Sequence, residues 1–186
     1  MDKTVALVMG IFLIVVIISF FISVYNKLVM LKFNIEKAFA NIDIILKQRA
    51  DEIPNIVKVI NQSTSYESGV LEKLTLLRTD FLNSSNIEDK TTISNEMSKT
   101  LKSVFSISEN YPTLLSNNSF LELQKRVSGL EDKIADRREF FNDSVNLYNI
   151  GIYEFPNIIF AKLLNYTQRT LLTISESEKK YDGVSF

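Results

Sequence analysis

The 186-residue sequence contains no cysteine and no histidine. Without cysteine there are no disulfides, no thiolate nucleophiles or metal ligands, and no lipid group attached through a lipobox cysteine. Without histidine the chain lacks the commonest general base near neutral pH, which excludes Ser-His-Asp triads and nearly all zinc sites. Mg²⁺ or Ca²⁺ binding by carboxylates alone is the metal chemistry left open. Although that chemistry is possible in principle, we expect no catalytic residue, no metal site and no cofactor.

Glycine and proline are scarce, with five and three residues, while 46% of the chain is hydrophobic. This composition argues against disorder and against a turn-rich β-sandwich or barrel, and it favours an all-α protein. The 21 basic and 22 acidic residues nearly cancel, and no segment concentrates lysine and arginine. No nucleic-acid partner is expected.

One long hydrophobic run lies near the N-terminus, where residues 5–24 read VALVMGIFLIVVIISFFISV without a charge. As a helix rising about 1.5 Å per residue, this segment would span about 30 Å, the hydrocarbon thickness of a bilayer. Bulky Phe20, Phe21 and Ile22 stand where a signal peptide would have a small-residue cleavage site. The sequence therefore predicts an uncleaved single-pass anchor with the lipid bilayer as its partner.

Positive charges flank this segment unequally. Lys3 is offset by Asp2, whereas lysines at 27, 32 and 37 follow the segment closely. The positive-inside rule then predicts that the N-terminus lies outside the cell membrane and that the rest of the chain is cytoplasmic.

Beyond the anchor, apolar residues recur at alternating steps of three and four, the period of one helix face. Nothing breaks the chain between Val24 and Leu28, so the anchor is expected to continue as one rod. Residues 63–108 carry two further faces, Tyr66 to Phe81 and Ile93 to Val104, separated by NSSN at 83–86. Whether they form one bent helix or two stays open at this point. The segment 110–119, NYPTLLSNNS, should end a helix.

Another helical face runs from Leu123 to Ile152, and a short final helix is expected to start at Phe155 and Pro156. Its apolar residues, Ile159, Leu163 and Tyr166, are expected to face inward. We predict an all-α fold, an N-terminal transmembrane helix followed by an antiparallel up-and-down bundle of about four helices. The expected parts are the short N-terminus and anchor at 1–24, the bundle at 25–168 and a polar tail at 169–186.

Two long stretches resemble the LemA family. Residues 25–60, YNKLVMLKFNIEKAFANIDIILKQRADEIPNIVKVI, are similar to its opening signature, and residues 109–149, ENYPTLLSNNSFLELQKRVSGLEDKIADRREFFNDSVNLYN, to its second, followed by FPNIIFAKLLNY at 155–166. Departures include Phe141 for a usual Tyr, Val127 for a usual Leu, and an unmatched segment at 83–100. The resemblance implies an anchored helical bundle and no catalytic residue. The signature residues are Tyr25, Asn26, Arg49, Pro54, Asn55, Tyr111, Pro112, Glu131, Arg137, Tyr148, Asn149, Phe155 and Pro156.

Arg49 and Arg137 each occupy a position on the apolar face of a predicted helix, where the spacing predicts a buried residue. One interpretation is an anion pocket built from both arginines. The other, which we favour, is that carboxylates on facing helices hold each guanidinium, because buried arginines persist mainly when paired. The carboxylate candidates are Asp51, Glu52, Glu131 and Asp136, and the family resemblance indicates Glu131 most clearly.

Pro54 is expected to kink the rod, or to restart it with Asp51 as a cap. A hinge that moves on binding is the functional alternative. The Tyr-Asn pairs at 25–26 and 148–149 are interpreted as interfacial anchoring and as capping or interhelical hydrogen bonding.

Three classes of function fit the sequence. The favoured one is a membrane-anchored scaffold or adaptor that docks a protein partner or a second copy of itself. The alternatives are a regulator of envelope stress or membrane proteolysis, and an enzyme or anion-binding module built from carboxylates and arginines.

Overall fold

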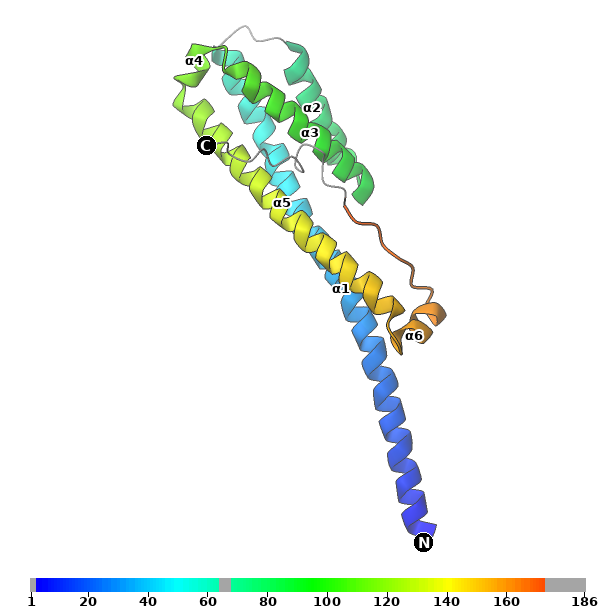
Figure 1. Ribbon diagram of the computed structural model, residues 1–186. Helices are drawn as coiled ribbons and strands as arrows, with labels where there is room; N and C mark the ends of the chain where they lie inside the picture. The colour runs from blue at the N-terminus through cyan, green and yellow to red at the C-terminus, as the bar shows by residue number, and fades with distance from the viewer. Residues whose placement is uncertain (1–2, 64–67, 173–186) are drawn as a thin grey trace, which may run out of the picture. The chain divides into compact units, whose positions relative to one another are not determined.

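The computed structural model describes residues 3–63 and 68–172, and every regular element within these ranges is a helix (Figure 1). The all-α prediction is confirmed. Contacts divide the chain into two units: of the described residues, the first contains 3–39 and 140–171, and the second contains 40–63, 68–139 and 172. Two long helices, α1 and α5, contribute to both units. The boundaries expected after residues 24 and 168 stay predictions.

Helix α1, Lys3–Ser63, is one uninterrupted rod, as predicted. Its apolar N-terminal part is unburied, and by length and composition it is long and apolar enough to cross a membrane. This property points to membrane association. Helix α1 also passes through Pro54, so the predicted restart at Asp51 is wrong. Ile53 and Ile56 beside the proline are fully buried, and packing of this face compensates for the backbone hydrogen bond that proline removes.

The second unit is a bundle of four helical segments: residues 40–63 of α1, α2 (Ser68–Asn83), α3 (Ile87–Ser108) and residues 118–139 of α5 (Asn118–Tyr153). Residues 84–86 separate α2 from α3, so the region left open in the sequence contains two helices. Asn86 caps α3, because its side chain accepts a hydrogen bond from the Glu88 backbone N–H. Tyr66, predicted to begin the α2 face, lies outside the described residues.

The break predicted at 110–119 is confirmed, and it contains a single helical turn, α4 (Pro112–Leu115). Pro112 occupies the first turn of α4, where its missing N–H costs nothing. The predicted apolar face of α5 is confirmed along its length. Its buried members are Leu123, Val127, Leu130, Ile134, Phe141, Val145, Tyr148 and Ile152.

In the first unit, α1 and α5 pack around a core of Leu28, Tyr148 and Ile152, which Ala161 of α6 (Asn157–Leu163) completes. A Cβ atom on Gly151 would lie 2.4 Å from Cδ1 of Leu31, so the glycine permits close approach of α5 to α1. The carbonyl of Gly151 also accepts a hydrogen bond of 3.0 Å from the buried side chain of Asn157. This bond fixes α6 to the end of α5.

The predicted inward face of the last helix is only partly correct. Tyr166 is half-buried and packs against the core of the first unit. Ile159 and Leu163 instead point outward, with exposed fractions of 58% and 78%. Helix α6 is seven residues long and uses Asn157 and Ala161 as its buried face, so these two large side chains fall on the opposite side.

Candidate functional site

Arg49 is the largest fully buried side chain of the second unit and the centre of a polar network linking three helices. Its Nη1 donates to Oε1 of Glu131 on α5 at 2.7 Å and to Oγ of Ser98 on α3 at 2.5 Å. Its Nη2 donates to the carbonyl oxygen and Oγ of Ser94, at 3.0 and 2.7 Å. Glu131 is the carboxylate that the family resemblance indicated. Nε of Arg49 is buried without a hydrogen-bond partner among the described residues.

Serines on α3 extend this network. Ser98 Oγ donates to Oε2 of Glu131 at 2.9 Å, so the carboxylate binds the guanidinium and the hydroxyl together. Ser94 Oγ also accepts from Nη2 of Arg138 at 3.2 Å, and the same nitrogen donates to Oδ1 of Asn95 at 2.7 Å. The network therefore carries two buried guanidinium groups and binds α3 to both α1 and α5.

The second buried arginine is Arg138, and the prediction of Arg137 is wrong. Arg138 is 2% exposed, whereas the side chain of Arg137 is exposed. Both positions keep the three-and-four spacing between Ile134 and Phe141, so the apolar period alone does not separate them. Asp136 and Asp51 are exposed as well and do not hold the buried arginines.

Sequence reasoning also missed Ser94 and Ser98. The available signal was periodicity, because Ser94, Met97, Leu101 and Val104 continue one face at steps of three, four and three, and all four are buried. A serine on such a face predicts a buried hydroxyl that needs a partner.

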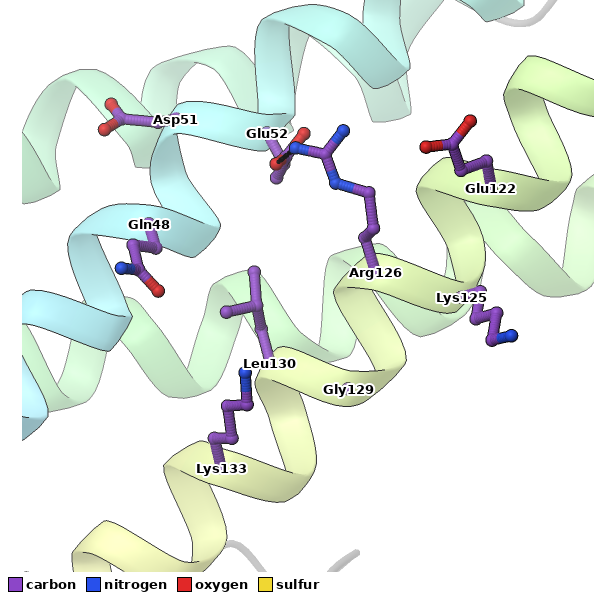
Figure 2. Close-up of a pocket in the computed structure, with 9 residues that line it drawn as sticks. All are labelled: Gln48, Asp51, Glu52, Glu122, Lys125, Arg126, Gly129, Leu130 and Lys133. Carbon is purple, nitrogen blue, oxygen red and sulfur yellow. Dashed lines mark hydrogen bonds and ion pairs between the residues drawn. The ribbon is translucent and has the colours of Figure 1, made fainter.

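A groove of about 610 Å³ lies between α1 and α5 in the second unit, and Figure 2 shows the side chains that line it. Glu52 and Arg126 point toward one another from the two helices and form an ion pair. Asn55 Nδ2 donates to the other oxygen of Glu52 at 3.2 Å. The remaining lining residues are Gln48, Asp51, Glu122, Lys125, Gly129, Leu130 and Lys133.

The charges of the groove balance, with three acidic and three basic side chains in the lining. Arg49 does not line it, and both Nη atoms of Arg49 are occupied by protein acceptors, so the anion pocket built on Arg49 and Arg137 has no geometric support. Among the described residues no group of three acidic side chains is arranged to hold a metal ion.

The second Tyr-Asn pair holds the C-terminal segment of the first unit. Tyr148 Oη donates to the carbonyl of Thr167 at 3.1 Å, and burial raises the pKa of this phenol. The Asn149 side chain donates to the carbonyl of Arg169 and accepts from its N–H, both at 2.9 Å. The pair is structural, and the start of the predicted polar tail is hydrogen-bonded to α5.

The other signature residues do not gather into one site. Tyr25 and Asn26 are exposed on the α1 turn after the apolar segment, and Asn55 is exposed beside Glu52. Tyr111 and Pro112 form the start of α4. Phe155 and Pro156 form the corner between α5 and α6.

Comparison with known proteins gives two findings. The model of the LemA family matches residues 38–186. The chain is also 36% identical over 53 residues to the magnetosome protein MamQ of Magnetospirillum gryphiswaldense. This similarity covers 28% of the chain and 20% of MamQ, so the chain matches only about one fifth of that relative's length.

Proposed function

The chain belongs to the LemA family, and from this premise we propose that it is a single-pass membrane protein whose helical bundle docks a partner protein, or a second copy of the chain, in the cytoplasm. The observation that carries the proposal is the continuity of α1. One helix supplies an unburied apolar segment of membrane-spanning length and one wall of the bundle.

The character of the bundle favours docking over catalysis. Its buried charged groups are used to join helices, as the contacts of Arg49 with Ser94 and Glu131 illustrate. The LemA family is not known as an enzyme family. The groove between α1 and α5 presents acidic and basic side chains together, which supports a protein surface of mixed charge as its partner.

The cytoplasmic location rests on the lysines that follow the apolar segment. We assign the bundle to the inner side of the cell membrane, with the N-terminus outside.

A single cysteine tests orientation and docking together, because the natural chain has none. Ser128 is exposed beside Gly129 of the groove, and Thr92 on α3 is exposed outside it, which makes Thr92→Cys a matched control. A membrane-impermeant maleimide should label Ser128→Cys only after lysis. In intact cells, a permeant thiol-to-amine crosslinker should give discrete adducts from Ser128→Cys and not from Thr92→Cys.

Maleimide labelling tests the orientation and crosslinking tests the docking, so each proposal can be overturned without the other. Labelling of Ser128→Cys in spheroplasts without lysis would reverse the orientation and leave docking untouched. Labelling only after lysis, with the same adducts or none from both variants, would overturn docking at the groove.

A further inference from the structure

Helix α6 presents an apolar face that none of the described parts of the chain, residues 3–63 and 68–172, covers. Phe155, Ile159 and Leu163 are 84%, 58% and 78% exposed. They recur at steps of four, so Ile159 and Leu163 lie on one side of the helix, and Phe155 lies two residues before its start at Asn157. Such a row of large apolar side chains is unfavourable in water.

The position of α6 along α1 indicates what covers this face. The rings of Phe160 and Phe21 are in edge-to-face contact, with centroids 5.4 Å apart. Phe21 belongs to the apolar segment, three residues or about 4.5 Å of helix rise before its end at Val24. Helix α6 therefore contacts α1 at the depth where that segment would leave the hydrocarbon of a bilayer.

A second contact, just beyond the apolar segment of α1, also places the end of α5 near the membrane surface. Lys27 Nζ lies 2.8 Å from Oε2 of Glu154, and both side chains are about half exposed. Lys27 is three residues beyond Val24, about 4.5 Å further along the helix, which is the level of lipid headgroups. Phe155 follows Glu154 directly, and the exposed aromatic rings of Tyr25 and Tyr153 suit the same interfacial zone.

We propose that α6 is an interfacial membrane helix: Phe155, Ile159 and Leu163 insert into the acyl-chain boundary of the bilayer that α1 crosses. The helix then lies along the membrane surface while Asn157 and Ala161 hold it to the first unit. Lys162, exposed in its last turn, reaches the headgroups. This inference rests on the membrane-spanning role of α1 proposed above, and it adds a second membrane contact to the chain.

Fluorescence quenching in liposomes tests the depth of α6 with the full chain. The fluorophore NBD is attached to one introduced cysteine at a time, and the bilayer is phosphatidylcholine and phosphatidylglycerol with or without a doxyl-labelled lipid. Leu163→Cys and Ile159→Cys probe α6. Val15→Cys in the apolar segment reports insertion, and Asn34→Cys is the aqueous control, because it is exposed on α1 about 15 Å beyond Val24. Circular dichroism confirms that each labelled variant keeps the helical content of the unmodified chain.

We expect quenching at Leu163→Cys and Ile159→Cys to be closer to that at Val15→Cys than to that at Asn34→Cys. Quenching at Val15→Cys with none at either α6 position would overturn the interfacial helix and leave the anchor intact. A blue-shifted but unquenched signal at α6 would assign the face to a second copy of the chain instead. Absence of quenching at Val15→Cys would overturn the anchor, and the interfacial helix with it.

Discussion

The two units are both helical, but they bury different kinds of side chain. The core of the second unit includes two buried arginines, a glutamate and serines that join α1, α3 and α5. The core of the first unit is apolar, built on Leu28, Ile152 and the body of Tyr148. Its polar contacts lie at the edge, where Lys27 pairs with Glu154 and Asn149 binds the Arg169 backbone.

This difference assigns different roles to the same two helices. Apolar packing is nondirectional, whereas a buried guanidinium requires specific acceptors and so penalises any register of α1, α3 and α5 that fails to supply them. In the second unit the network therefore specifies one arrangement of the bundle. In the first unit packing is sufficient, and the uncovered apolar surface of α1 and α6 is available to lipid.

Arg49→Ala should have the largest effect, because it removes the charge at the centre of the second unit. The substitution removes the charge that Glu131 and Ser94 bind and leaves a cavity and unpaired polar groups in the core. Loss of one partner of a buried ion pair typically costs about 3 to 5 kcal/mol. We expect the detergent-solubilised variant to unfold at a clearly lower temperature by circular dichroism at 222 nm.

Arg137→Ala is the matched control, since this arginine is exposed on α5 and should change the free energy of unfolding by no more than about 0.5 kcal/mol. Equal effects of the two substitutions would remove the distinction between Arg49 and a surface arginine. An unchanged unfolding midpoint for Arg49→Ala, combined with loss of the Ser128→Cys adducts, would make the network part of the docking site.

The sequence specified the helices better than the directions in which their side chains point. Long apolar faces predicted α1 and α5, because helical periodicity accumulates over many turns. It could not separate Arg137 from Arg138, since both positions keep the three-and-four spacing of the apolar face. Nor could it show that Ile159 and Leu163 face away from protein, because a lipid-facing stripe and a core-facing stripe have the same spacing. The Ser94 contacts needed the structure, as they join residues far apart in the chain.

In the first unit, Asn149→Ala should act locally. It removes both hydrogen bonds to the Arg169 backbone, each worth about 0.5 to 1.5 kcal/mol net, and leaves the apolar core intact. Hydrogen exchange measured by mass spectrometry should become faster in the peptide containing Arg169 and stay unchanged in the peptides of α3. Asn146→Ala, exposed one turn earlier on α5, should leave both protected. Faster exchange in α3 as well would mean that the two units do not respond independently.

The smallest expected effect concerns Tyr148, whose ring packs in the apolar core and whose hydroxyl binds the Thr167 carbonyl. Burial raises the pKa of its phenol above the ordinary value of about 10. Between that value and the folded-state pKa, the folded protein keeps a proton that the unfolded chain has lost. The stabilisation by Tyr148 is thus fully present below about pH 10 and is lost as pH rises through the folded-state pKa.

Tyr148→Phe should lower the free energy of unfolding by about 1 kcal/mol near neutral pH through loss of the bond to Thr167. The gap between wild type and variant should narrow as pH rises above about 10 in chemical denaturation, whereas exposed Leu147→Ala should keep the wild-type pH dependence. A difference in the free energy of unfolding that does not change with pH would mean that the phenol has the same pKa in the folded and unfolded chains. Burial in the first unit would then not disfavour the ionised form of Tyr148.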